Sequence, residues 1–149
     1  MEWFKIEWKG TYPTETAQKR IESEGIGVYA IYETRGKSLL KLLYIGETYK
    51  QTFGTRLKQH KRDWLDNIKV NTVTCFGVVC LPEGKRLSSQ RVLDVEKYLI
   101  HSHRPPFNTI SKQGYNGREI MLINTGKTGK LETVLADREL LSLLRKYLA

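Results

Sequence analysis

"GVYAIY" (residues 27–32) and "LYIGE" (residues 43–47) are two short apolar stretches that decide the predicted fold. Each contains the β-branched, aromatic and small residues that favour a strand, and "RGKS" between them favours a turn. We therefore expect a hairpin that turns at Gly36–Lys37. In that register Tyr29 and Tyr44 would lie directly opposite each other on one face of the sheet. Such a pair is either a structural aromatic contact, which is common, or part of a site.

The remaining segments show both strand-like and helix-like patterns, which predicts an α+β protein with a small antiparallel sheet at its centre. A helix should end before Pro105–Pro106, because proline cannot continue it. We expect a strand near residues 3–8, a helix over 14–23 capped by Thr14, a helix over 54–68, a third strand over 72–81, a helix over 88–103, a hairpin over 118–135 and a terminal helix over 136–149 that packs on the domain.

The chain is basic. It has 149 residues, with 25 Lys and Arg against 16 Asp and Glu, so the formal net charge is +9. The length is that of one domain. The charge fits an ordinary basic surface or a polyanionic partner, most often nucleic acid.

The sequence also predicts a cellular compartment. No apolar run approaches the length of a membrane span, and the first residues lack the pattern of a signal peptide. Cys75 and Cys80 are separated by an odd spacing, so in a regular strand they point to opposite faces and cannot pair. We therefore expect a cytoplasmic protein with reduced thiols and no membrane partner.

Glu96 is the most anomalous charge in the chain. On the helix over 88–103 it falls in the apolar arc, whereas Asp94, Lys97 and His101 fall on the opposite side and are expected to be solvated. A carboxylate on the face toward the core is costly unless it is paired, hydrogen-bonded or bound to a metal. A structural salt bridge and a functional carboxylate are both compatible with this pattern.

Arg56 and His60 lie on the helix over 54–68 at an i,i+4 spacing, so they share one flank of its apolar arc. Residues on such a flank are half-buried and can reach over the sheet edge. They are either ordinary surface residues without a specific role or two members of one site.

Together these residues resemble the GIY-YIG nuclease superfamily. The first motif appears as "GVY", with Val28 in place of the usual Ile, and the second as an unaltered "YIG" after a somewhat long gap. The resemblance covers about residues 27–110. The matching functional residues are Tyr29, Tyr44, Arg56, His60, Glu96 and Asn108.

The resemblance implies a three-stranded antiparallel sheet flanked by helices and hydrolysis of DNA phosphodiester bonds with one divalent ion, Mg²⁺ or Mn²⁺. Glu96 would be its protein ligand, and Arg56 would hold the phosphate. Tyr29 would be the general base and Tyr44 would position the water or the phosphate, although the two could exchange roles.

The resemblance also implies two supporting residues. His60, when neutral, would accept a hydrogen bond from a tyrosine hydroxyl, and Asn108 would orient the site. The single domain would consist of a catalytic core over 25–110 with extensions over 1–24 and 111–149.

DNA is the expected partner, and the expected binding cations on the helix over 54–68 are Arg56, Lys58, Lys61 and Arg62. The main alternative is a non-catalytic protein that retains the fold and binds DNA or RNA. The oligomeric state, monomer or homodimer, stays open.

Overall fold

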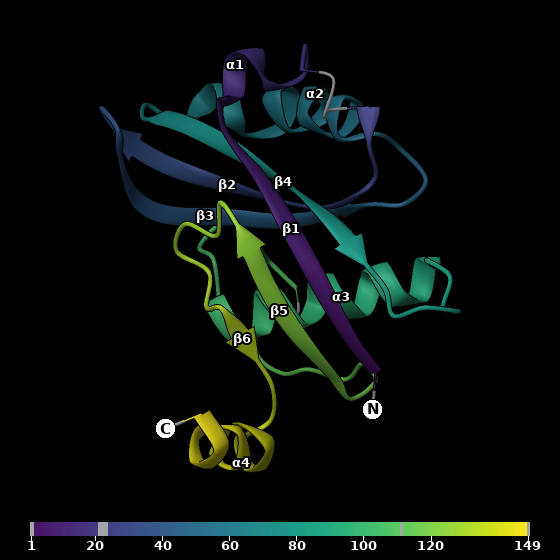
Figure 1. The fold of residues 1–149 in the computed structure, drawn as a ribbon. Helices are drawn as coiled ribbons and strands as arrows, with labels where there is room; N and C mark the ends of the chain where they lie inside the picture. Colours follow the sequence, from purple (N-terminus) through teal and green to yellow (C-terminus); the bar gives the residue numbers. More distant parts are fainter. Residues whose placement is uncertain (1, 21–23, 111, 149) are drawn as a thin grey trace.

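The computed structural model describes residues 2–20, 24–110 and 112–148. Within them, one curled six-stranded sheet is accompanied by helices, in the strand order β3-β2-β4-β1-β5-β6 (Figure 1). The strands are β1 (Glu2–Pro13), β2 (Gly27–Arg35), β3 (Ser38–Thr48), β4 (Asn71–Cys80), β5 (Ile120–Gly126) and β6 (Val134–Leu135). The helices are α1 (Thr14–Ala17), α2 (Phe53–Asp63), the 3₁₀ turn η2 (Leu65–Asn67), α3 (Ser89–His103) and α4 (Arg138–Leu148).

The α+β class is confirmed, but the prediction of a three-stranded sheet is wrong. β1 pairs antiparallel with β4 and parallel with β5, and β5 pairs antiparallel with β6. β1 therefore covers the edge of β4 that a three-stranded sheet would leave with unpaired backbone groups. Phe4, Ile6 and Trp8 alternate along β1 and are all buried, so this strand also contributes to the core.

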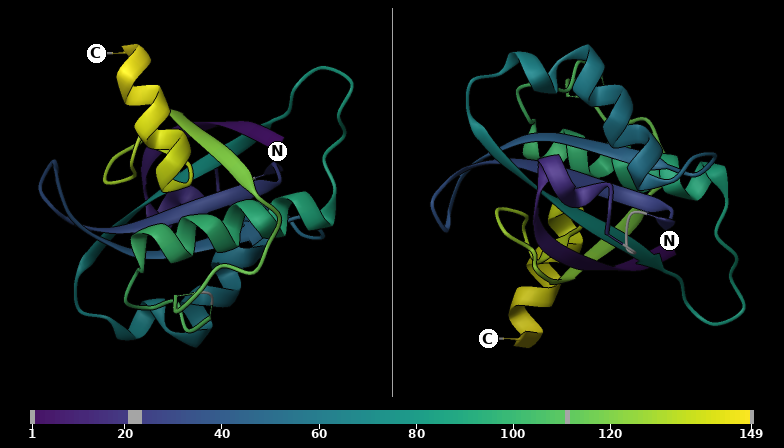
Figure 2. Two further views of the ribbon diagram at one scale, coloured as in Figure 1. Left: turned by 90° about the horizontal axis from the view of Figure 1, so that it is seen from below. Right: turned by 90° about the horizontal axis from the view of Figure 1, so that it is seen from above.

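Strand alternation sends the side chains of β2 to two different cores. Val28, Ala30 and Tyr32 pack on the face covered by α3. Tyr29 and Ile31 pack on the other face, against residues of α1 and α2. The sheet is thus sandwiched between α3 on one side and α1 and α2 on the other (Figure 2).

The hairpin of β2 and β3 turns where the sequence predicts, because Arg35 pairs with Ser38. The predicted direct opposition of Tyr29 and Tyr44 is nevertheless wrong. Two register irregularities each add one residue to β3, so Tyr29 pairs with Gly46 and Tyr44 with Ile31. A shift of two residues keeps a side chain on the same face. The two phenol rings therefore still meet diagonally, with their centroids 6.0 Å apart.

This packing explains the glycines of both motifs. The phenol of Tyr29 lies so close to Gly46 that any Cβ there would overlap it. Gly27 has a φ of +151°, and a Cβ there would overlap the carbonyl oxygen of Gly77. Only glycine allows these close approaches without moving a neighbour.

Three predicted elements have different bounds in the structure. The strand expected near residues 3–8 extends over Glu2–Pro13. α1 spans only Thr14–Ala17, and Pro13 occupies its N-cap position, so the predicted cap at Thr14 is wrong. The hydroxyl of Thr14 instead contacts the hydroxyl of Thr74. Residues 21–23 of that predicted helix lie outside the described part of the chain. The helix expected over 54–68 ends at Asp63, because Trp64 has a φ of −150°.

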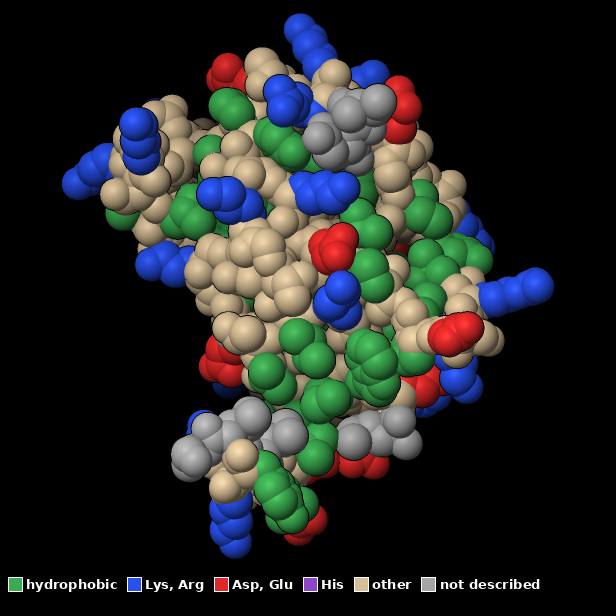
Figure 3. Space-filling view, in the orientation of Figure 1, with side chains coloured by type: hydrophobic (Ala, Val, Ile, Leu, Met, Phe, Trp, Pro, Cys, Tyr) green, Lys and Arg blue, Asp and Glu red, His purple; other side chains and the backbone are tan. Residues whose placement is uncertain are grey.

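The C-terminal hairpin is confirmed as β5 and β6, and in the terminal helix α4 Leu140 and Leu141 are half-buried. α4 projects away from the sheet (Figure 2), and none of its described side chains is buried. Leu143 and Tyr147 are 52% and 85% exposed. On the face seen in Figure 3, hydrophobic side chains gather in the lower half, next to α4. No helix among the described residues has the length and apolar character needed to cross a membrane.

Candidate active site

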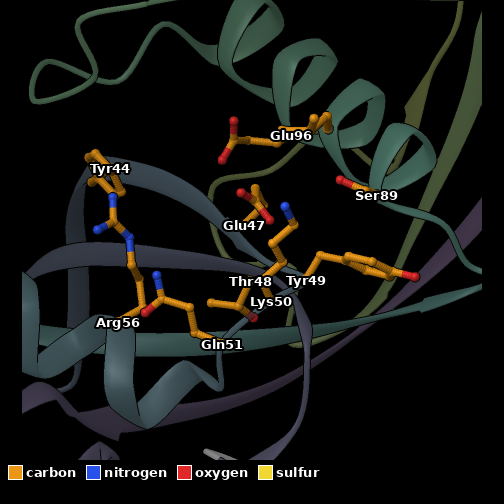
Figure 4. Close-up of a pocket in the computed structure, with 10 residues that line it drawn as sticks. Tyr44, Glu47, Thr48, Tyr49, Lys50, Gln51, Arg56, Ser89 and Glu96 are labelled. Atoms are coloured by element: carbon orange, nitrogen blue, oxygen red, sulfur yellow. The ribbon is translucent and has the colours of Figure 1, made fainter.

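A cavity of about 440 Å³ opens at the edge strand β3, where α2 approaches from one face of the sheet and α3 from the other. Figure 4 shows the side chains that surround it. The cavity is lined by Tyr44, Glu47, Thr48, Tyr49, Lys50, Gln51, Arg56, Ser89, Leu93 and Glu96. Three sequence-predicted site residues, Tyr44, Arg56 and Glu96, thus come together from β3, α2 and α3.

Behind Tyr44, the cavity wall continues into a buried aromatic cluster. The Tyr29 hydroxyl contacts Nε2 of His60 at 2.5 Å, and the Trp64 indole Nε1 donates to Nδ1 of the same ring at 3.0 Å. His60 is 3% exposed. Burial, and secondarily the charge of Arg56, lowers the pKa of His60 to about 4. The imidazole is therefore neutral at physiological pH.

Arg56 interacts electrostatically with both phenols. Burial lowers its pKa, but the electrostatic and hydrogen-bond interactions with Tyr29 and Tyr44 outweigh this and raise it overall. Its Nη1 donates to Oε1 of Gln59 at 2.8 Å, and Gln59 in turn donates to Gln51 at 3.0 Å. The guanidinium is thus oriented by its own helix and by the loop that precedes it.

Glu96 faces a second carboxylate that the sequence analysis missed. Glu47 of β3 and Glu96 of α3 point toward each other across the cavity (Figure 4). Burial, followed by the charge of Glu47, raises the pKa of Glu96 to about 7, although Arg56 and Lys97 oppose this shift. Strand alternation is the signal that could have found Glu47, because it follows buried Ile45 on the face toward α3.

Asp94 contradicts the expectation that the opposite side of α3 is solvated. Its side chain is fully buried, and it accepts hydrogen bonds from Arg118 Nε at 2.8 Å and from Gln90 Nε2 at 2.8 Å. The chain between α3 and β5 covers this side of the helix and brings Arg118 to it. Lys97 and His101 are half-buried. A helical projection identifies the stripe facing the sheet but not a second segment that covers the other side.

Asn108 is brought to β3 but not to the cavity. Its side-chain amide accepts from the Ile45 N–H at 2.9 Å and donates to the Ile45 carbonyl at 2.8 Å. It therefore pairs with the edge of β3 as another strand would. Next to it, Phe107 stacks on Trp64 with ring centroids 4.8 Å apart. Asn108 thus fixes the segment that packs on the aromatic cluster.

Of the four cations predicted to bind DNA, only Arg56 lines the cavity. At about 100° per residue, Lys58, Lys61 and Arg62 lie on the side of α2 away from Arg56. Lys61 donates to the Glu15 carbonyl at 3.0 Å, on the side of α1. The cation that joins Arg56 at the cavity is Lys50, on the loop before α2.

The donor set fits a hard divalent ion held mainly by water and substrate. Among the described residues there is no group of three or more His, Cys, Asp or Glu that could hold a metal ion. Mg²⁺ commonly keeps several waters and takes one or two carboxylates together with phosphate oxygens. Glu96 and Glu47 are two carboxylates that line the cavity.

The chain matches no protein-family model, no curated protein and no solved structure. The motif residues and their arrangement around the cavity are therefore the features that indicate a function.

Proposed function

We propose that this protein is a divalent-metal-dependent endonuclease that hydrolyses DNA phosphodiester bonds. The observation that carries this proposal is the convergence of Glu96, Arg56 and Tyr44, from three separate elements, on one open cavity. In phosphate hydrolysis, a carboxylate can bind a metal ion, a fixed guanidinium can stabilise charge and a phenol can transfer a proton.

Glu96 would hold one Mg²⁺ or Mn²⁺, and Glu47 is placed to hold the same ion or its waters. When bound, such an ion neutralises charge on the phosphate and on the leaving oxygen. The raised pKa of Glu96 fits this role, because a cation at the site would replace the proton that burial and Glu47 favour.

Arg56 would bind the non-bridging oxygens of the scissile phosphate. Its hydrogen bond to Gln59 leaves other guanidinium N–H groups to donate to the phosphate. The geometry is preorganised, which makes such donors effective when charge develops in the transition state. Lys50 adds a second positive charge at the cavity mouth.

Tyr44 is better placed than Tyr29 to act as the general base. Tyr44 lines the cavity, whereas Tyr29 is 1% exposed and lies behind it. Burial raises the pKa of Tyr44, and Arg56 together with a hydrogen bond from Tyr29 opposes that rise. In the proposed step, Tyr44 first releases its hydroxyl proton to solvent. Its phenolate then takes a proton from a water molecule whose oxygen attacks phosphorus, the bond from phosphorus to the leaving sugar oxygen breaks, and that sugar oxygen takes a proton from solvent.

Cleavage of supercoiled, linear and branched DNA, with Mg²⁺ or with EDTA, tests the proposal. The wild type should cut at least one substrate in Mg²⁺ only, and Glu96→Gln should lose this activity while it still binds DNA. Glu83→Gln is the matched control, because Glu83 is an exposed carboxylate in the loop before α3. Cleavage by Glu96→Gln at the wild-type rate would refute the assignment.

The competing function is nucleic-acid binding without catalysis, which the net charge of +9 favours. Such a protein would bind DNA or RNA with strong salt dependence but without a metal requirement. Tight binding with no cleavage of any of these DNAs would support this function instead.

A further inference from the structure

Trp64 determines which nitrogen of His60 carries the proton. The indole N–H can only donate, so Nδ1 of His60 must be the acceptor of their 3.0 Å hydrogen bond. A neutral imidazole has a single N–H, which must then be on Nε2. Trp64 thereby fixes one tautomer of a buried histidine.

The tautomer sets the direction of the next hydrogen bond. Nε2 of His60 lies 2.5 Å from the Tyr29 oxygen, and because it bears the proton it donates to that oxygen. This reverses the expectation that His60 accepts from a tyrosine. The hydroxyl proton of Tyr29 is then left to donate to a different acceptor, and its neighbour is Tyr44, whose ring centroid is 6.0 Å away. The hydrogen bonds therefore run in one direction from Trp64 through His60 to the Tyr29 oxygen, and the Tyr29 hydroxyl is left with Tyr44 as its neighbour.

Trp64 is held in place from both sides. Its ring stacks on Phe107 at an interplanar angle of 13°, and its backbone N–H donates to the His60 carbonyl at 2.9 Å. The ring also contacts Tyr44, with centroids 5.6 Å apart. Phenylalanine at this position would keep the stacking and lose only the N–H.

We propose that Trp64 is a positioning residue of the site, whose indole N–H directs the Tyr29 hydroxyl proton toward Tyr44 by fixing the tautomer of His60. The catalytic part of this inference rests on the proposed nuclease function. Without the indole N–H, His60 can carry its proton on Nδ1 and accept from Tyr29 through Nε2. Tyr44 would then lose a donor that stabilises its phenolate.

Nitrogen-15 NMR of the histidine rings reads the tautomer without any substrate. In the wild type, His60 should show a protonated Nε2 and an unprotonated Nδ1; its signals are identified by their loss in His60→Asn. His103 is an internal reference for the other tautomer, because its Nδ1 donates to the Leu99 carbonyl and its Nε2 accepts from the Glu132 N–H. In Trp64→Phe, we expect the Nδ1–H form of His60 to become populated.

Cleavage kinetics form the second part of the experiment. Trp64→Phe should lower kcat by about tenfold or more, the scale of losing one hydrogen bond to the reacting group, and leave KM nearly unchanged. Trp8→Phe is the matched control, because it removes another buried indole donor, to Asn124 Oδ1 at 2.8 Å, outside the site. It should change neither the His60 tautomer nor kcat.

Three results would overturn the proposal. The first is a wild-type His60 that is protonated on Nδ1. The second is a changed His60 tautomer in Trp64→Phe with an unchanged kcat. The third is a lowered kcat in Trp64→Phe with an unchanged His60 tautomer, which would mean that Trp64 acts through packing. If the wild type cuts no DNA, the nuclease function fails. The tautomers of the wild type and of Trp64→Phe then still decide whether Trp64 orients His60.

Discussion

Glu96 occupies a position where ionisation is unfavourable. Its side chain is half-buried at the cavity wall and faces Glu47, and both effects favour the protonated form. The charges of Arg56 and Lys97 compensate only in part. In the proposed nuclease, a cation bound in the cavity would satisfy this charge.

This environment predicts a pH-dependent effect of Glu96→Gln on stability. The pKa of Glu96 is raised from 4.5 to about 7 on folding, so between these values the folded protein holds a proton that the unfolded chain has released. The contribution of Glu96 to stability is thus fully present below pH 4.5 and is lost as the pH rises through 7. Since glutamine mimics the protonated acid, Glu96→Gln should match the wild type at pH 4, below the unfolded pKa, and exceed its unfolding free energy at pH 8 by on the order of 1–3 kcal/mol.

Urea unfolding in EDTA at the two pH values measures this difference. The pKa of His60 is lowered to about 4 and gives a pH dependence of the opposite sign, but it is present in both proteins and cancels in the comparison. Glu83→Gln, at an exposed position, should show no gain at pH 8. A gain for Glu96→Gln that is equal at both pH values would contradict the assigned ionisation.

At the scale of elements, the site is a junction that three segments hold in register. β3 brings Tyr44 and Glu47 on its two faces, α2 brings Arg56 and His60, and α3 brings Glu96. Nothing within β3 fixes its outer edge, because β3 is the last strand of the sheet. The segment after α3 does so through Asn108, and it also places Phe107 on Trp64.

Asn108→Ala should therefore loosen the edge of β3. It leaves the N–H and the carbonyl of Ile45 without their partners, which costs on the order of 1–3 kcal/mol of unfolding free energy. Hydrogen exchange should accelerate most at the Ile45 amide. Thr109→Ala, at the exposed neighbouring position, is the control and should stay close to the wild type. An unchanged Ile45 exchange rate in Asn108→Ala would contradict this function of the amide.

At the scale of the whole molecule, the predictable parts are those encoded by local patterns. The β2–β3 turn, α3 and the inward position of Glu96 follow from turn residues and helical periodicity. The parallel pairing of β1 with β5 joins segments near opposite ends of the chain, and no local sequence periodicity predicts such a pairing. The two extra residues in β3, the burial of Asp94 by Arg118 and the donor direction set by Trp64 are likewise consequences of tertiary packing.

The position of β1 predicts that the core over 25–110 does not fold by itself. Removing the flanking segments exposes the edge of β4 and takes Phe4, Ile6 and Trp8 out of the core that α3 covers. Unpaired strand edges and lost apolar burial both disfavour a stable monomer. The fragment 25–110 should therefore show no cooperative urea unfolding, whereas the fragment 1–137, which lacks only α4, should unfold cooperatively. A cooperative transition of 25–110 would mean that β1 and β5 are additions to an independent core, and the site could then be studied on that core alone.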